Sequence, residues 1–262
     1  MGLLDTIMSG LENRPPRIMI YGREGVGKST FGASAPSPAF IDTEGGLGHI
    51  NCKKFPLSRS LSEVLAKLAS LRDDPHEYQT VVVDSIDWLE RLIFDEVCRE
   101  FGVRSIEKAD GGYGKGYVHA LTHWRNIINL LQDLRDKRNM IIILVAHAKV
   151  ERFEDPENAA YDRYTPRLHK HAASLIAEWV DAVLFATQRY RVTKDSGDRA
   201  IAAPIGADGG ERIIRTVGSP ACVAKNRFGL PSEIPLSWAA FIDAYAKARS
   251  ANNAGGEQCP TK

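Results

Sequence analysis

Hydrophobic residues in this chain follow two alternating patterns, short continuous runs and longer segments with helical spacing. The continuous runs cover residues 17–21, 39–42, 80–84 and 139–146. Between them, apolar side chains recur every three or four positions, as in 61–71 and 86–101. Buried strands that alternate with amphipathic helices are typical of a parallel sheet with crossover helices. The pattern predicts an α/β fold in which a mostly parallel, twisted sheet is flanked by helices.

The C-terminal part of the chain has a different pattern. Short apolar segments at 190–192, 200–202 and 212–215, separated by Asp-Ser-Gly and Asp-Gly-Gly turns, predict antiparallel strands. Residues 241–248 predict a closing helix. The Asn-, Gly- and Ala-rich residues 250–262 predict a disordered tail.

The N-terminal residues 1–16 form a short separate segment that ends in Pro15-Pro16. One helical face of this segment carries an apolar stripe made of Leu3, Leu4, Ile7, Met8 and Leu11. The stripe predicts an amphipathic helix, which either covers the sheet of its own chain or contacts a neighbouring subunit. The main domain is predicted to span residues 17–249.

A phosphate-binding motif directly follows the first apolar run. Residues 22–29 read Gly-Arg-Glu-Gly-Val-Gly-Lys-Ser, which matches G-x-x-x-x-G-K-[ST] between a strand and a helix. In such a loop, Lys28 supplies positive charge for the β- and γ-phosphates and Ser29 supplies a hydroxyl for Mg²⁺. The motif predicts ATP and Mg²⁺ as ligands. The predicted nucleotide-binding residues are Gly22, Arg23, Glu24, Gly25, Val26, Gly27, Lys28, Ser29 and Thr30.

Two carboxylates are placed to act on a bound triphosphate. Asp84 ends the Val-rich run 80–84, where a carboxylate suits Mg²⁺, although it could instead cap the next helix. Glu44 follows the run 39–42, and a carboxylate there can orient and deprotonate the attacking water. Asp42 competes for this role, because strand alternation places it on the same side. We expect Ser29 and Asp84 to hold the metal and Glu44 to be the base.

A polar residue, His147, follows the most apolar run of the chain. At the end of a strand, such a residue can hydrogen-bond the γ-phosphate and report its loss to the following segment. A structural histidine is the alternative.

These features occur in the order of the RecA-type ATPase core: Glu after the second strand, Asp after the third and a polar residue after the fourth. Residues 225–229 read Lys-Asn-Arg-Phe-Gly, a string that characterises the bacterial RadA branch of RecA-like proteins. With Gly114-Lys115-Gly116-Tyr117 and its short length, the chain resembles the phage-type single-domain RecA/RadA-like ATPases over residues 17–245. The resemblance implies a RecA-like P-loop core.

The resemblance also implies roles for single residues. Lys28, Glu44 and His147 would be the phosphate ligand, the base and the γ-phosphate sensor. Lys225 and Arg227 would act in the site of a neighbouring subunit, where an arginine from outside neutralises charge on the transferred phosphoryl group. The alternative for these two is an ordinary surface charge. A homo-oligomer, as a ring or a filament, follows from the trans role.

Members of this group hold single-stranded DNA in two loops, which correspond here to residues 103–117 and 149–168. Glycines, cations and aromatic side chains in these segments suit sequence-neutral strand binding. The predicted DNA contacts are Arg104, Lys108, Tyr113, Lys115, Tyr117, Lys149, Arg152, Arg163 and Arg167. The second segment also carries acidic residues that bring its net charge near zero, so an ordinary mobile loop is the alternative.

Composition restricts the location of the protein more than its partners. The 262 residues are 44% hydrophobic with a net charge of +1, which allows one large α/β domain and neither supports nor excludes nucleic acid. The 4 cysteines show no C-x-x-C spacing, and the sequence contains neither a signal-peptide pattern nor an apolar run long enough to span a membrane. We expect a cytoplasmic protein (host cytoplasm if phage-encoded) without a membrane partner.

Together, the motifs and the resemblance predict a Mg²⁺-dependent ATPase that binds single-stranded DNA as an oligomer. Members of the group act as recombinases or annealing proteins, which implies homologous recombination by strand annealing or exchange and a single-strand-binding protein as a further partner. Two alternatives use the same core. One is a DNA-translocating replication helicase or loader, and the other is a nucleotide-switched assembly adaptor that binds no DNA.

Overall fold

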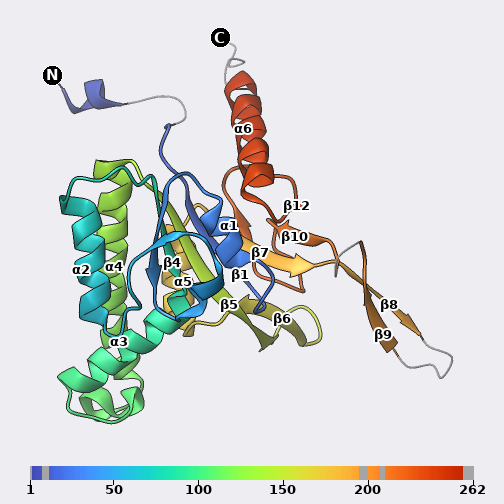
Figure 1. The fold of residues 1–262 in the computed structure, drawn as a ribbon. Helices are drawn as coiled ribbons and strands as arrows, with labels where there is room; N and C mark the ends of the chain where they lie inside the picture. Colours follow the sequence, from blue (N-terminus) through green and yellow to red (C-terminus); the bar gives the residue numbers. More distant parts are fainter. Residues whose placement is uncertain (1, 8–11, 195–199, 207–209, 256–262) are drawn as a thin grey trace.

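A single mixed sheet runs through the molecule, with helices on both faces (Figure 1). The computed structural model describes residues 2–7, 12–194, 200–206 and 210–255. The main path of the sheet has the order β12-β10-β7-β1-β5-β4-β2-β3. Its strands are β1 (Arg17–Gly22), β2 (Pro38–Asp42), β3 (Lys53–Lys54), β4 (Thr80–Asp84), β5 (Ile141–Phe153), β7 (Ala182–Gln188), β10 (Arg212–Arg215) and β12 (Glu233–Pro235).

Along the sheet from β7 through β1, β5, β4 and β2 to β3, each strand pairs in parallel with the next. β10 pairs antiparallel with β7 and with β12. Two further strands join the sheet away from this path, β6 (Tyr161–Pro166) on β5 and β11 (Lys225–Asn226) on β7. A separate hairpin of β8 (Tyr190–Lys194) and β9 (Ala200–Pro204) projects from the body in Figure 1. The predicted α/β architecture, a mostly parallel sheet flanked by helices with antiparallel C-terminal strands, is confirmed.

Helices cover the two faces of the sheet unequally. One face packs against α2 (Leu61–Asp73), α3 (Ile86–Glu100), α4 (Lys115–Arg138) and α5 (Lys170–Trp179), and the other against α1 (Lys28–Ala33) and α6 (Trp238–Gly255). The central strands are buried from both sides, which is why they read as continuous apolar runs. Short 3₁₀ helices occur at η1 (Leu3–Thr6), η2 (Gly46–His49) and η3 (Ile106–Gly111).

The segment 149–168 is not the polar loop that the sequence suggested. β5 continues to Phe153 and turns back as β6, so this segment is mostly an antiparallel hairpin. The register sets Glu151 opposite Arg163 and Arg152 opposite Asp162. Opposite charges across a strand pair are favourable, so the acids and bases that suggested a loop are the cross-strand partners of a hairpin.

The ends of the chain also differ from expectation. Within the described part of the N-terminal segment there is a 3₁₀ turn, Leu3–Thr6, whose apolar side chains are exposed. Met8 and Leu11 of the predicted stripe lie outside the described residues. α6 continues to Gly255, so residues 250–255 are helical rather than disordered, in keeping with the high helix propensity of alanine. The rest of the predicted tail, 256–262, lies outside the described residues. None of the helices in the described ranges is both long and apolar enough to cross a membrane.

Candidate nucleotide site

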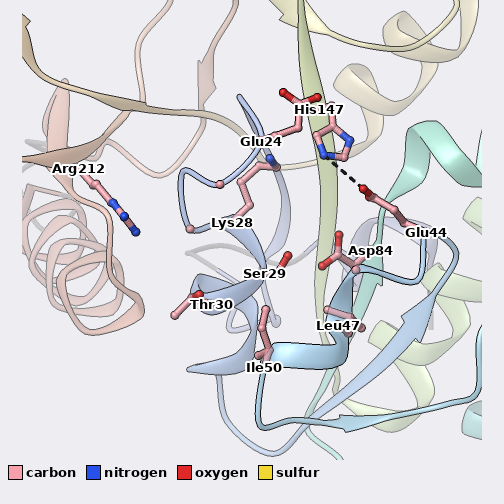
Figure 2. A pocket seen from close by; sticks show the side chains of 13 residues that line it. Glu24, Lys28, Ser29, Thr30, Glu44, Leu47, Ile50, Asp84, His147 and Arg212 are labelled. Carbon is pink, nitrogen blue, oxygen red and sulfur yellow. Dashed lines mark ion pairs between the residues drawn. The ribbon is translucent and has the colours of Figure 1, made fainter. Parts of the chain in front are cut away.

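The carboxyl ends of β1 and β4 meet His147 in the middle of β5 beside the start of α1, and these elements border a cavity of about 300 Å³ (Figure 2). Parallel pairing brings this about, since Gly22 lies opposite His147 and Asp84 lies opposite both Asp42 and Val145. Ligands of open α/β sheets bind at this edge. The cavity is lined by Glu24, Gly25, Gly27, Lys28, Ser29, Thr30, Glu44, Gly46, Leu47, Ile50, Asp84, His147 and Arg212.

The phosphate loop requires its glycines for two separate reasons. Gly25 and Gly27 have φ angles of 72° and 111°, which side-chain-bearing residues rarely adopt. At Gly22, a Cβ would lie 2.3 Å from the carbonyl oxygen of Ala186 on the neighbouring β7. Val26 is buried in the core below the loop and anchors it. The loop is thereby held in a turn whose N–H groups suit an anion at the start of α1.

Lys28 is buried at the centre of this loop. Its ammonium donates hydrogen bonds to the carbonyl oxygens of Gly22 at 3.1 Å and Arg23 at 2.8 Å. Burial lowers the pKa of the ammonium, and the nearby carboxylates, Asp84 first among them, act in the opposite direction. A lysine held in this way presents its charge to the phosphates that the loop binds.

Asp84 and Ser29 fit the ligand set of a magnesium ion. Asp84 is buried, and its Oδ2 has no hydrogen-bond partner among the described residues. Burial raises the pKa of Asp84 to about 6, while the Ser29 hydroxyl lowers it and Glu44 raises it further. The alternative cap role is not supported, because the N-cap residue of α3 is Ser85. A carboxylate and a hydroxyl beside the phosphate loop would hold Mg²⁺, which neutralises charge on the β- and γ-phosphates when bound.

The structure gives different roles to the two acidic residues at the end of β2, Asp42 within the strand and Glu44 after it. Asp42 Oδ1 accepts the backbone N–H groups of Glu44 at 3.0 Å and Gly45 at 2.7 Å, so Asp42 builds the turn. Glu44 lines the cavity, and its Oε2 accepts a hydrogen bond from Ser85 Oγ at 3.0 Å. Of the two, Glu44 is therefore placed to meet a water at the phosphate end.

His147 does not end its strand, because β5 runs on to Phe153. It occupies the last position of β5 that pairs with β1, and the pairing with β6 begins at Ala148. Its ring Nε2 lies 3.8 Å from Glu44 Oε1, as the dashed line in Figure 2 marks. The sequence predicted that the strand ends before His147. In the structure, β5 stops pairing with β1 at His147 and pairs with β6 beyond it, and His147 lines the cavity at this point.

Two predicted nucleotide residues differ in orientation. Thr30 lines the cavity, whereas the Arg23 side chain points away from it and donates a hydrogen bond to the Tyr164 hydroxyl at 2.7 Å. Only the Arg23 carbonyl, which accepts from Lys28, contributes to the loop interior. Arg23 is therefore placed against β6 rather than against the phosphates.

Lys225 and Arg227 lie at the amino end of β7, away from the cavity of their own chain. The Lys225 ammonium donates to three carbonyl oxygens at the end of α5, those of Ala177, Glu178 and Val180. These contacts hold the Lys225 side chain against α5 of its own chain, and its action in a neighbouring site stays a prediction. Arg227 is exposed, so its action in a neighbouring site stays a prediction.

The expected DNA residues fall into two groups. The side chains of one group are exposed, and this group consists of Arg104, Lys108, Tyr113, Lys115 and Arg152. Others are held by the protein itself: the Tyr117 ring stacks on His169 at 4.1 Å, and Arg167 forms an ion pair with Asp87 at 2.7 Å. Lys149 donates to the Leu168 carbonyl, and the Arg163 guanidinium lies over the Phe153 ring at 3.8 Å.

Sequence reasoning missed several residues at the site. Arg212 comes from β10 and approaches the loop from the side opposite Glu44 in Figure 2. Leu47 and Ile50, from η2 and the residue after it, add apolar surface. Asp87 in the first turn of α3 lies behind His147, with its oxygens 3.1 and 3.2 Å from the ring Nδ1. Its position as the acidic residue in the first turn of the helix after Asp84 is a signal that could have indicated Asp87.

A comparison with protein families agrees with a nucleotide site. The family described as "AAA domain" matches residues 14–228. A curated protein, the SPbeta prophage-derived uncharacterized protein YorG of Bacillus subtilis (strain 168), is 24% identical over 188 residues. The alignment covers 70% of this chain and 53% of YorG, so the chain spans about half the length of that relative. Among solved structures, the RadB recombinase matches with 15% identity and a TM-score of 0.48, over 87% of this chain and 90% of that one.

Proposed function

The chain belongs to the AAA domain family and is a P-loop ATPase, and we propose that it binds single-stranded DNA as a homo-oligomer. In this proposal, ATP hydrolysis accompanies strand annealing or strand exchange. The chemical part uses the cavity residues described above: Lys28 and the loop amides bind the phosphates, and Glu44 takes a proton from the attacking water. Ser29 and Asp84 would hold Mg²⁺.

A cationic cavity of about 260 Å³ carries the DNA part of the proposal. It lies between the β5–β6 hairpin and α5, and its charged lining consists of Lys149, Arg163, Lys170 and one acid, Glu151. Glu151 accepts the Thr165 hydroxyl at 3.2 Å and forms an ion pair with the Lys149 ammonium at 3.8 Å. Arg163 Nε is buried without a hydrogen-bond partner among the described residues. With Lys149 paired to Glu151, Arg163 and Lys170 leave the cavity with a net positive charge, which suits the phosphates of a nucleic-acid backbone.

The other predicted DNA segment lies next to this cavity. The stacked rings of Tyr117 and His169 join the start of α4 to the start of α5, so the Gly-rich residues before α4 are close to the hairpin side of α5. Tyr113 at the exposed turn is fully accessible and could stack on a base. Cations and an aromatic ring on neighbouring elements are the features that sequence-neutral strand binding uses.

ATP hydrolysis with and without single-stranded DNA tests the proposal, with duplex DNA as the comparison. We expect stimulation by single strands alone. Arg163→Ala and Lys170→Ala should weaken strand binding, and each lost phosphate contact should reduce the slope of log affinity against log salt by about 0.7. Lys137→Ala is the matched control, since Lys137 is exposed near the far end of α4 and pairs with Asp133.

Two outcomes would contradict the proposal. Hydrolysis that is indifferent to every DNA would favour the adaptor that binds no DNA. Equal strand affinity in Arg163→Ala, Lys170→Ala and Lys137→Ala would remove the cationic cavity as the binding surface. Annealing of complementary strands, followed by fluorescence energy transfer, would then distinguish a recombination protein from a DNA-stimulated motor.

A further inference from the structure

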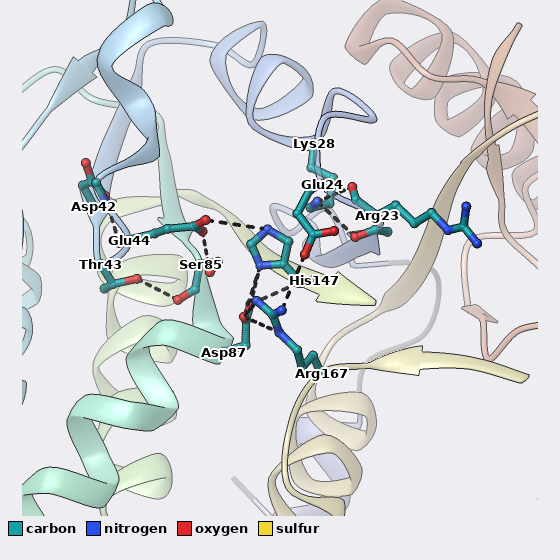
Figure 3. Close-up of polar contacts among 12 residues, drawn as sticks. Arg23, Glu24, Lys28, Asp42, Thr43, Glu44, Ser85, Asp87, His147 and Arg167 are labelled. Atoms are coloured by element: carbon teal, nitrogen blue, oxygen red, sulfur yellow. Dashed lines mark hydrogen bonds and ion pairs between the residues drawn. The ribbon is translucent and has the colours of Figure 1, made fainter. Parts of the chain in front are cut away.

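Asp87 is a buried carboxylate that receives more hydrogen bonds than its neighbours at the site, yet it does not line the cavity. Its oxygens accept from the His147 backbone N–H at 3.0 Å and from the His147 ring Nδ1 at 3.1 Å. They also accept from Arg167 Nε at 3.1 Å and Nη2 at 2.7 Å. Figure 3 shows these side chains converging on Asp87 from β5 and from the residue after β6.

The first consequence concerns the orientation of His147. A carboxylate at Nδ1 requires a proton on that nitrogen, which leaves Nε2 as the ring atom that faces the cavity. Nε2 is also the atom 3.8 Å from Glu44 Oε1. Because Asp87 holds both the backbone N–H and the ring of His147, the ring cannot turn away without losing charge-assisted hydrogen bonds.

The second consequence concerns the β5–β6 hairpin. Arg167 directly follows β6, and its backbone N–H donates to the His147 carbonyl at 2.8 Å. Its guanidinium contacts Asp87 on one side and lies 3.5 Å from Glu24 of the phosphate loop on the other (Figure 3). A displacement of the hairpin would therefore reach the carboxylate that orients His147.

Burial and charge agree with this arrangement. Burial alone would raise the pKa of Asp87, but the hydrogen bonds from His147 and Arg167 outweigh it and hold the pKa well below its ordinary value. The carboxylate is thus a fixed negative charge, and it stands on the far side of His147 from Glu44.

We propose that Asp87 is a positioning residue of the ATPase site, which orients His147 toward Glu44 and couples the site to the β5–β6 hairpin through Arg167. The coupling to the hairpin rests on the proposed DNA-binding function. The orientation of His147 does not, because it concerns hydrolysis in the absence of DNA.

The central experiment compares Asp87→Asn with the wild-type chain in steady-state ATP hydrolysis. The amide keeps the shape, but its single oxygen cannot accept both the Arg167 donors at Oδ2 and the His147 backbone N–H at Oδ1. We expect kcat without DNA to fall by about 10- to 100-fold with KM for ATP unchanged, because misplaced catalytic groups cost rate rather than binding. Asp87→Glu, which restores the charge, should recover part of kcat.

Asp181→Asn is the matched control, since Asp181 is a buried carboxylate that pairs with Arg17 at the opposite end of the strands. It should lower the folded fraction and leave kcat per folded molecule unchanged. If Asp87→Asn behaves in the same way, Asp87 is only structural and the proposal is wrong.

Arg167→Gln provides a second route, because Arg167 is partly exposed and its replacement leaves the Asp87–His147 pair in place. We expect it to reduce the stimulation by single-stranded DNA, and its effect should not add to that of Asp87→Asn. Full additivity, or stimulation at the wild-type level, would overturn the coupling. If DNA does not stimulate even the wild-type chain, the proposed function fails, while the kcat ratio between Asp87→Asn and wild type still decides the orientation of His147.

Discussion

The two ends of the parallel strands hold buried carboxylates in opposite situations. At the amino end, Asp181 accepts hydrogen bonds from the Arg17 backbone and guanidinium, and Arg135 lies 3.5 Å away. At the carboxyl end, Asp84 has an oxygen without a partner among the described residues, although it is as well buried. The hydrogen bonds of the Asp181 carboxylate are thus supplied by the protein, whereas Asp84 has Lys28 nearby but no hydrogen-bond donor at its Oδ2 among the described residues.

The pKa values of the two groups express the same difference. Burial acts to raise both, but at Asp181 the hydrogen bonds from Arg17 outweigh it and the pKa is lowered. At Asp84, burial prevails and the pKa rises to about 6. A buried carboxylate whose oxygens are hydrogen-bonded stabilises the fold, whereas a carboxylate in a cavity with a raised pKa indicates a candidate functional site. Substitutions at the two ends should therefore have opposite effects on activity and stability.

The largest effect is expected for Glu44→Gln at the carboxyl end. Hydrolysis should fall by about 10²- to 10⁴-fold, because the amide cannot accept the proton of the attacking water, and ATP binding should persist. Turnover and binding of a fluorescent ATP analogue measure the two separately. Glu77→Gln, on an exposed residue, is the control. Loss of ATP binding together with hydrolysis would show that Glu44 supports the turn rather than the chemistry.

At the amino end, Asp181→Asn should act on stability. It leaves Arg17 and Arg135 without their buried counter-charge, which typically costs about 3–5 kcal/mol. The native pKa of Asp181 is lowered, so its contribution is present above the unfolded pKa of about 3.9 and is lost as the pH falls through the native value.

Urea denaturation across pH measures this contribution, and the difference between Asp181→Asn and wild type should shrink in acid. The Asp181→Asn substitution should leave kcat per folded molecule at the wild-type level. A loss of kcat at unchanged stability would remove the distinction between the two ends of the sheet.

The sequence predicted most of the site residues at the carboxyl end of the parallel strands and few of the contacts at their amino end. The phosphate loop, Glu44 and Asp84 follow directly from local motifs at strand ends, and the structure gathers them around one cavity. Arg212 and the Arg17–Asp181 pair join residues far apart in the chain, which no local pattern encodes. A short motif reports the residues that it contains, whereas a tertiary contact requires the pairing of strands to be known.

The same reason explains the error at the hairpin and the contacts of Lys225 that the sequence did not predict. Mixed charges in 149–168 suggest a loop until the register shows them as cross-strand pairs. Lys225 belongs to a string that implies a trans-acting cation, yet the end of α5 takes up its ammonium. In both cases, the partner of a charge decides its role, and the partner comes from the fold.

The smallest effect on stability, and the sharpest comparison with Asp181, is expected for Asp84→Asn in the presence of EDTA. The native pKa of Asp84 is raised to about 6 from about 3.9, so the wild-type chain loses stability as the pH rises between these values. Removing the charge should make the metal-free chain more stable at pH 8 by about 2–3 kcal/mol and should have little effect below pH 4. Urea denaturation at both pH values measures this, with the exposed Asp95→Asn as control.

The Asp84→Asn variant should also lose ATP hydrolysis, because the substitution removes the proposed Mg²⁺ ligand. A less stable Asp84→Asn at pH 8 would mean that the carboxylate serves the fold as Asp181 does, and the magnesium assignment would have to move to another residue.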